Sequence, residues 1–211
     1  MRDLFDLLFG PYQNYTLTEK ILEAVAVVLG IVSVLYSKRN SVLLYPTGLI
    51  SSLIYIYLLY HWQLYGDLTI NSYYVYMSIY GWVLWTGQYK KNNDCLKITK
   101  ISPKDYLNCS LIFIISIIFA STIYIFFDKF GHWWSYPDII MTGLLFVGTW
   151  LLAKRKLENW LFLIAGDVIA IPLFFIKGYA LTGILNIFLT IIAIYGYKAW
   201  KKTLLNNAPV Q

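Results

Sequence analysis

Charged residues are scarce in this sequence. They form 13% of its 211 residues, whereas 59% of the residues are hydrophobic. A soluble domain carries roughly 25% charged residues, so the composition excludes a soluble globular protein and is typical of an integral membrane protein. The two ends and the polar stretch 87–104 are too short to form a soluble domain of their own.

Residues that bind metals or form disulfides are also few. Of the two cysteines, Cys95 is expected in a loop and Cys109 inside an apolar span, which argues against a disulfide or a thiolate metal site. The two histidines, His61 and His132, are expected in loops and match no ligand set. The sequence has no glycine-rich phosphate loop followed by Lys-Ser or Lys-Thr, so we expect neither an ATPase nor a bound cofactor.

Long apolar runs are what the sequence has in abundance. A hydrocarbon core about 30 Å thick is crossed by around 20 apolar residues in a helix. No basic start and no small-residue cleavage site precede the first run, so we expect no cleavable signal peptide. The sequence therefore predicts an all-α protein with one transmembrane domain over residues 1–211. Its seven expected spans, of which the third and fifth are weaker, are 19–36, 41–60, 68–86, 106–127, 137–153, 158–176 and 180–200.

The net charge of +6 is distributed unevenly. If the N-terminus is outside, the inner segments hold thirteen Lys and Arg, and the outer side keeps only Arg2, Lys20, Lys129 and Lys177. The positive-inside rule then predicts an outer N-terminus and a cytoplasmic C-terminus. Because the basic residues lie at membrane edges on one side, we expect a lipid bilayer as the partner and no nucleic acid.

Part of the sequence is repeated within the chain. The segment IYGWVLW at 79–85 matches IYGYKAW at 194–200 with an offset of 115, which also places Asn71 on Asn186. These matches and those at a second offset, in one order along the chain, predict two parallel three-helix repeats, 19–86 and 137–200, joined by a linker helix at 106–127. This is a 3+1+3 arrangement like that of small sugar carriers (SWEET-like). An offset of 118 aligns Gly30 with Gly148, Lys38 with Lys156, Gly48 with Gly166 and Leu49 with Asp167.

Asp167 is a carboxylate in the middle of an apolar span. About 14 Å of helix separates it from Glu158 on one side and from Lys177 on the other. An ionisable group at that depth is costly unless it faces a polar cavity or a partner, so Asp167 is the first candidate for contact with a solute. Asn71 and Asn186 are the next candidates. The alternatives are hydrogen bonds between helices for the asparagines, and a bond to a tyrosine or the backbone for Asp167.

Aromatic residues make up 18% of the chain. Tyr73, Tyr76 and Tyr80 recur at helical spacing and either line a path for a solute or pack against a neighbouring helix. Trp160 is either an interfacial residue or a ring that stacks on a solute. A carboxylate, two amides and aromatic faces together suit a flat ring with a delocalised positive charge. Most other aromatics are expected in belts at the membrane surfaces, on the inner side at Trp82, Trp85 and Trp200.

Several separated segments resemble a known family. They are YPTGLI at 45–50, LYGD at 64–67, SIYGW at 78–82, ENW at 158–160, KG at 177–178 and YGY at 195–197. Together they are similar to the PnuC family of bacterial vitamin transporters over nearly the whole chain. The resemblance implies a homotrimeric facilitator of the bacterial inner membrane with the 3+1+3 fold. Members carry nicotinamide riboside, and related ones carry thiamine or riboflavin. It also implies import without ion or ATP coupling, with the substrate trapped by cytoplasmic phosphorylation.

Two departures from the family pattern bear on the substrate. Nicotinamide riboside carriers of this family usually show Trp-x-x-Trp in the sixth span, whereas here Trp160 is followed by Leu163. An acid, Asp167, stands where the family has a polar residue, and the family's glutamine in the third span corresponds most closely to Asn71. Losing one aromatic wall weakens stacking by about 1 kcal/mol, which keeps thiamine, also an aromatic cation, as an alternative.

We therefore predict a passive carrier that imports nicotinamide riboside by alternating access. Asp167 and Asn186 would orient the solute from one triplet of helices, and Asn71 and Tyr76 would contact it from the other. Trp160, with Leu163 beside it, would stack on its ring. The alternatives are a thiamine carrier, an integral-membrane enzyme, and a receptor or scaffold without flux. Against the enzyme stands the lack of paired carboxylates, of a histidine cluster and of a Ser/His constellation at one depth.

Overall fold

The computed structural model describes residues 15–62, 65–92, 97–128, 130–131, 133–176 and 180–206. Predictions that concern other positions lie outside the described residues. These positions include Arg2, Leu64, Cys95, Lys129, His132, Lys177 and Gly178.

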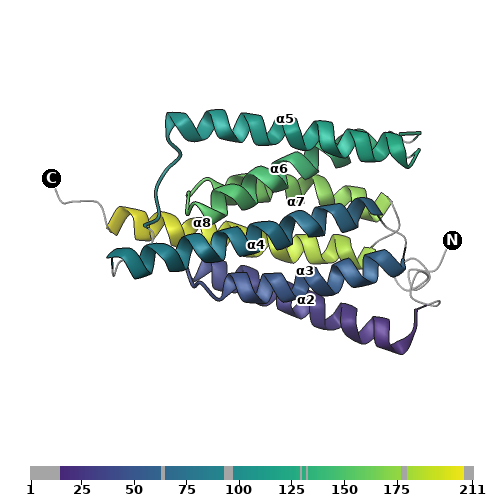
Figure 1. Cartoon of the computed structure of the whole chain (residues 1–211), viewed down its shortest axis with the longest axis horizontal. Coiled ribbons are helices and arrows are strands. Elements are labelled where there is room, and N and C mark those ends of the chain that lie inside the picture. Colours follow the sequence, from purple (N-terminus) through teal and green to yellow (C-terminus); the bar gives the residue numbers. More distant parts are fainter. Residues whose placement is uncertain are drawn as a thin grey trace.

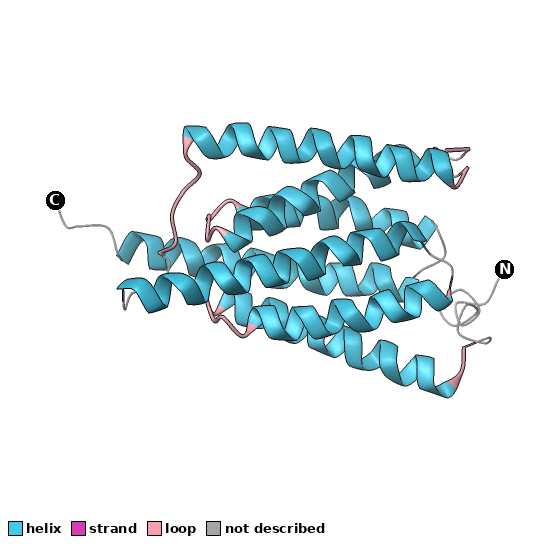
Figure 2. Ribbon diagram, in the orientation of Figure 1, coloured by secondary structure: helices cyan, strands magenta, loops and turns pink. Residues whose placement is uncertain are grey.

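Helices make up almost all of the described chain (Figures 1 and 2). Each overlaps one predicted span, so the prediction of an all-α protein with seven helices is confirmed for the described residues. Successive helices run in opposite directions, so α2 and α6 point the same way, as do α3 and α7, and α4 and α8. Their bounds are α2 Leu17–Lys38, α3 Leu44–His61, α4 Tyr65–Asn92, α5 Pro103–Phe126, α6 Ser135–Ala153, α7 Asn159–Ile176 and α8 Ala180–Asn206.

Local sequence explains where several helices begin. At the start of α2, the Thr16 side chain accepts a hydrogen bond from the Glu19 N–H, and the Glu19 carboxylate accepts one from the Thr16 N–H at 2.8 Å. Ser102 and Asp105 form the same reciprocal cap at the start of α5, where Pro103 is the first helical residue. These caps satisfy backbone N–H groups that a first turn leaves free.

The turns that end α2 and α6 have the same conformation. Asn40, with φ 59°, and Arg155, with φ 53°, both adopt the left-handed backbone region that terminates helices. The backbone N–H groups of Arg39 and Lys154, which precede them, each donate to a carbonyl four residues earlier at 3.2 Å. The corresponding residues of the two turns are 115 positions apart, so the chain leaves both helices in the same way.

Five of the described helices are long and apolar enough to cross a membrane, namely α2, α5, α6, α7 and the part of α8 from Thr182 to Asn206. The helices α3 and α4 do not reach the same hydropathy because tyrosine, serine and asparagine interrupt their apolar residues. The expected weakness of the third span is therefore confirmed. The expected weakness of the fifth, α6, is not.

Six helices form a closed ring. The helix α3 packs between α2 and α4, and α7 packs between α6 and α8, while contacts of α2 with α8 and of α4 with α6 complete the ring. The helix α5 lies outside it and packs mainly on α6 (Figure 1). In this order, α3 lies opposite α7 and α4 lies opposite α8. We call α2–α4 the first triplet and α6–α8 the second triplet.

One end of the ring carries a buried apolar cluster. We call it the basic end, because the turns after α2 and α6 lie there with Lys38, Arg39, Lys154, Arg155 and Lys156. The expectation that Trp85 and Trp200 belong to an interfacial belt is wrong, because both rings are buried inside this cluster. The basic-end cluster consists of Leu44, Tyr45, Trp85, Ile98, Leu157, Trp160, Ala193 and Trp200.

The packing of Tyr45 on Gly81 gives a stability prediction. A Cβ atom at Gly81 would lie 2.2 Å from Cε1 of Tyr45, so Gly81→Ala must displace a buried ring. We expect this change to lower the free energy of unfolding by about 1–3 kcal/mol, measured as a lower melting temperature in detergent. The control is Gly87→Ala on the same helix, where a Cβ meets nothing within 4 Å. Equal melting temperatures of the two variants would contradict the predicted packing.

Candidate solute cavity

The ring encloses a cavity of about 480 Å³. All six ring helices contribute to its wall, and the outer helix α5 contributes no residue to it. A cavity of this size lies within the range that holds vitamin-sized ligands, about 300–1,000 Å³.

Residues of the two triplets line the cavity at matching positions. Each of five lining residues of α3 has a lining residue of α7 exactly 115 positions later, and four lining residues of α4 match four of α8 in the same way. The pairs are Tyr45 with Trp160, Gly48 with Leu163, Ser52 with Asp167, Tyr55 with Ala170 and Leu59 with Phe174, and then Ile70 with Leu185, Asn71 with Asn186, Tyr74 with Leu189 and Ser78 with Ala193.

Close helix contacts follow the offset of 115 and not that of 118. A Cβ at Gly48 would meet Ser33 at 2.9 Å, and a Cβ at Gly148 would meet Leu163 at 2.8 Å. These two contacts occupy corresponding places, since Ser33 and Gly148, and likewise Gly48 and Leu163, are 115 positions apart. At the first contact the glycine lies on α3, whereas at the second contact it lies on α6. The alignment of Gly48 with Gly166 and of Gly30 with Gly148 was therefore wrong. The offset of 115 pairs Asp167 with Ser52, which also lines the cavity, and not with Leu49.

Asp167 faces the cavity from the middle of α7. Its side chain is 7% exposed, and no described residue gives it a hydrogen bond or an ion pair. The described lining residues include one further acid, Glu23, and no Lys, Arg or His. The described part of the cavity wall therefore contains acidic side chains and no basic one, which favours a positively charged ligand.

The two predicted asparagines line the same cavity from opposite helices, α4 and α8. The amide nitrogen of Asn186 donates to the Thr182 carbonyl of its own helix at 2.7 Å. This bond does not cross to another helix, so it does not support the alternative reading of Asn186 as a link between helices.

Tyr76 does not reach the cavity. It is 64% exposed on the outer side of α4, where its ring stacks on Tyr80. The neighbouring Tyr73 stacks on Phe146 of α6 and donates to its carbonyl at 2.9 Å. The tyrosine stripe is therefore a packing and outward face. The lining positions 70, 71, 74, 77 and 78 define the inner face of α4, and Tyr74 is the tyrosine that lies on it.

Trp160 and Leu163 lie in the cavity wall on α7. Trp160 is fully buried, its ring meets that of Trp200 edge-on at 5.5 Å, and it covers Gly196. Leu163 fills the space beside Gly148 of α6. In this arrangement Trp160 closes the cavity toward the basic end, and the predicted stacking on a solute stays a prediction.

Two tryptophans connect the two triplets by hydrogen bonds at the basic end, on the far side of Trp160 from the cavity. The indole N–H of Trp85 on α4 donates to the Ala153 carbonyl at the end of α6, at 2.9 Å. The indole N–H of Trp200 on α8 donates to the Ser37 carbonyl near the end of α2, at 3.0 Å. Each triplet thus holds the end of the other triplet's first helix. We call these two hydrogen bonds the tryptophan latches.

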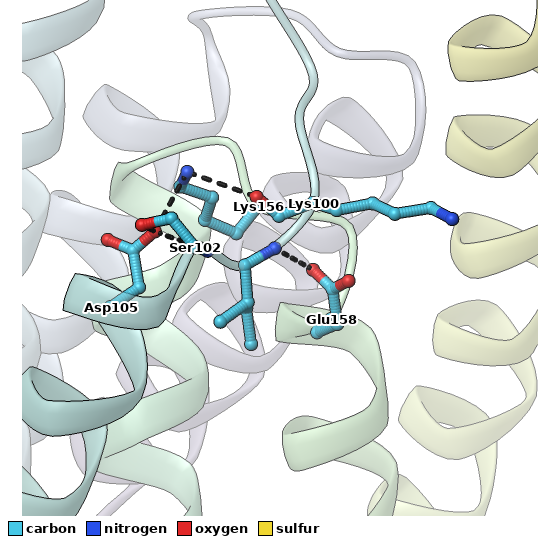
Figure 3. Close-up of polar contacts among 6 residues, drawn as sticks. Lys100, Ser102, Asp105, Lys156 and Glu158 are labelled. Carbon is cyan, nitrogen blue, oxygen red and sulfur yellow. Dashed lines mark hydrogen bonds and ion pairs between the residues drawn. The ribbon is translucent and has the colours of Figure 1, made fainter.

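A short segment, residues 97–102, crosses the basic end and binds the turn after α6 (Figure 3). The backbone of Thr99 donates to Arg155 at 3.1 Å and accepts from Leu157 at 2.9 Å. The Lys156 ammonium lies 3.0 Å from the Asp105 carboxylate and donates to the Lys100 carbonyl at 3.2 Å. This segment therefore fastens α5 to the second triplet.

A cation bridges the two turns at the same end. The guanidinium of Arg155 lies 3.7 Å from the centre of the Trp85 ring and donates to the Asn40 carbonyl at 3.0 Å. Arg155 is only 3% exposed, so the basic end is sealed by a network and not by apolar packing alone.

The cavity extends toward the opposite end. There it reaches Glu23, Tyr15 at the start of α2 and Trp62 at the end of α3. The rings of Tyr15 and Trp62 stack with their centres 4.4 Å apart. This stacked pair of rings therefore belongs to the cavity wall at the end opposite the basic end.

Sequence reasoning missed Ser52, Tyr45, Tyr55 and Tyr74 as lining residues. The signal for Ser52 was present, because the offset of 115 that aligned the third and seventh helices points to it directly. Within the described residues, no group of three His, Cys, Asp or Glu side chains is placed to hold a metal ion.

A ring of membrane helices around a solute-sized cavity that holds a few polar side chains is the architecture of a small-molecule transporter. The model of the nicotinamide mononucleotide transporter family matches residues 20–202. This chain belongs to that family, the PnuC family of membrane transporters.

Two named relatives and one solved structure are similar to the chain. The nicotinamide riboside transporter PnuC of Escherichia coli (strain K12) is 24% identical over 205 residues, which cover 85% of this chain and 84% of the relative. The protein of the same name from Shigella flexneri gives the same values. The crystal structure of the vitamin B3 transporter PnuC has a TM-score of 0.68 with 21% identity, covers 91% of this chain and 85% of its own, and shows a shared fold.

The segment of residues 97–102, which fastens α5 to the second triplet, gives a further prediction. Lys156→Met removes the ion pair with Asp105, whose side chain is 9% exposed, and leaves a carboxylate with one partner fewer. We expect a loss of about 1 kcal/mol or more in the free energy of unfolding, measured as a lower melting temperature in detergent. Lys104→Met, an exposed lysine on α5, is the control. A double cycle with Asp105→Asn that shows no coupling would contradict the assigned pair.

Proposed function

We propose that this transporter carries nicotinamide riboside into the cell as a passive, uncoupled facilitator. The observation that carries the proposal is Asp167, a buried carboxylate in the cavity wall, with which no Lys, Arg or His among the described residues forms an ion pair. A solute that brings a positive charge into the cavity would compensate it. The pyridinium ring of nicotinamide riboside has such a charge, spread over a flat aromatic face.

The acidic side chains of the wall also favour one of two related solutes, nicotinamide riboside over nicotinamide mononucleotide. The family is described by the mononucleotide and the relatives by the riboside, and the two molecules differ by one phosphate. A phosphate would bring an anion into a cavity whose described wall offers two acids and no Lys, Arg or His. The riboside avoids this repulsion, so we assign it and not the mononucleotide.

In the proposed complex, Asp167 and Asn186 orient the solute from the second triplet. Asn71 contacts it from the first triplet, on the helix opposite Asn186. Trp160 and Leu163 form the wall against its ring. Tyr76 has no part in this arrangement because it faces away from the cavity.

The two triplets are proposed to be parallel repeats that rock against each other. Matching lining positions, matching turns after α2 and α6 and matching helix directions all support this. With the N-terminus outside, the closed basic end is cytoplasmic. The buried Tyr45 hydroxyl and Trp160 N–H have no hydrogen-bond partner among the described residues, so the closed basic end is not fully satisfied.

Two further parts of the proposal come from the family resemblance. The protein would act as a homotrimer in the bacterial inner membrane. Phosphorylation of the riboside in the cytoplasm would trap it there, since the phosphate is poorly accommodated by the acidic wall.

Thiamine is the second candidate. The observation that favours it is Leu163, which stands where riboside carriers have a second tryptophan and packs beside Gly148. A wall with one aromatic ring fewer fits a solute of different shape with the same single charge. Ligand-induced thermal stabilisation with each vitamin separates the two, because a ligand that binds only the folded state raises the melting temperature.

The role of Asp167 can be tested with a change that keeps its shape. Asp167→Asn removes the charge, and we expect it to weaken riboside binding at least tenfold and to abolish saturable uptake into liposomes, because the cationic ring loses its partner. Binding is measured by titration calorimetry on the purified protein.

The matched control is Asp128→Asn, which removes an exposed carboxylate outside the cavity at a left-handed position that asparagine tolerates. Unchanged uptake by Asp167→Asn, with normal assembly, would refute the assigned role of this carboxylate.

The tryptophan latches predict how the basic end opens. Replacing Trp85 and Trp200 by phenylalanine keeps a smaller aromatic ring at each position and removes both N–H donors. Opening should then become about tenfold more frequent, at roughly 0.5–1.5 kcal/mol for each bond. The measurement is the rate at which an impermeant maleimide, added at the basic end, labels Ala193→Cys in a variant without Cys95 and Cys109.

The control for the latches is Trp82→Phe, on the same helix but at the outer surface. Equal labelling rates in the latch variant and in this control would argue against the latches as the closure.

A further inference from the structure

We infer that Ser52 is a solute-contacting residue that selects for the neutral, hydroxyl-bearing end of the solute. This assignment rests on the proposed function, because it completes the same cavity. Ser52 lies on α3, lines the cavity and is 8% exposed.

The Ser52 hydroxyl is free for a ligand. No described residue forms a hydrogen bond with it, although it is almost completely buried. Two other serine hydroxyls of the wall are engaged, since Ser51 donates to the Ala26 carbonyl at 2.7 Å and Ser33 donates to the Leu44 carbonyl at 2.7 Å. A buried hydroxyl is normally paired, so an unpaired one in a cavity wall indicates a partner that enters the cavity.

Its position in the ring places Ser52 across the cavity from Asp167. The two residues are 115 positions apart and occupy corresponding places on α3 and α7, which lie opposite each other in the ring. Asn71 and Asn186 have the same relation on α4 and α8. The hydroxyl of Ser52 and the amide of Asn71 on the first triplet thus correspond to the carboxylate of Asp167 and the amide of Asn186 on the second.

This difference between equivalent positions defines the ligand class. Two carboxylates would suit a solute with two positive charges, and two hydroxyls would suit a neutral one. One carboxylate opposite one hydroxyl suits a monocation with its charge at one end and neutral hydrogen-bonding groups at the other. In nicotinamide riboside these are the pyridinium ring and the ribose hydroxyls, so Ser52 is assigned to the ribose.

The test compares two ligands that share the charged ring. Nicotinamide riboside has the ribose, and 1-methylnicotinamide has the same pyridinium carboxamide without it. We expect Ser52→Ala to weaken riboside binding about three- to tenfold, as the loss of one hydrogen bond does, and to leave 1-methylnicotinamide binding unchanged. Asp167→Asn should weaken both ligands. Affinities are measured by calorimetry for the riboside and by competition for 1-methylnicotinamide.

The matched control is Ser72→Ala, an exposed serine on α4 whose hydroxyl donates to the Leu68 carbonyl. It should change neither affinity. Wild-type riboside affinity in Ser52→Ala, or an equal loss for both ligands, would overturn the assignment, since the second result describes a distorted cavity and not a lost contact.

A swap tests the equivalence of the two positions. Asp167→Ser should remove measurable riboside binding, and adding Ser52→Asp to the same chain should restore part of it by moving the acid across the cavity. A folded double variant without binding would contradict the equivalence. If the unaltered protein binds neither the riboside nor thiamine, the proposed function fails and Ser52 fails with it. If it binds the riboside and Ser52→Ala binds equally well, the Ser52 assignment alone fails.

Discussion

The structure depends on one constraint, which is that a carboxylate must be accommodated within a membrane-spanning bundle. Asp167 sits halfway along α7, too far from either end of the helix to reach water outside the ring. The six helices around it meet this constraint with a cavity whose wall also offers hydroxyl and amide groups. The described wall holds no Lys, Arg or His, and in the proposed function the solute would supply the balancing charge.

The cavity and the basic end form one mechanical unit. Tyr45 and Trp160 belong both to the cavity wall and to the basic-end cluster, and each packs on a glycine and a tryptophan of the following helix. In the proposed mechanism, a solute that contacts Tyr45 and Trp160 would also move the rings of Trp85 and Trp200, whose N–H groups bind the opposite triplet. This gives the proposed rocking motion a physical connection between binding and opening.

The number of helices and the candidate carboxylate could be predicted from the sequence, because long apolar runs and a single buried charge are local signals. The alignment of the first two helices of each triplet could not. Gly48 packs on Ser33, but at the corresponding contact the glycine is Gly148 and its partner is Leu163, so matching glycine with glycine shifted the alignment by three residues and hid Ser52. The spacing of Tyr73, Tyr76 and Tyr80 revealed one face of α4, but only its neighbours α3 and α6 decide which face points inward.

The claim that the cavity is built for a cation is tested most directly by calorimetric titration of the purified protein with nicotinamide riboside and nicotinamide mononucleotide at the same ionic strength. These ligands differ only by the phosphate. The account predicts binding of the riboside and at least about tenfold weaker binding of the mononucleotide, because the phosphate meets an acidic wall. Equal or tighter binding of the mononucleotide would contradict it.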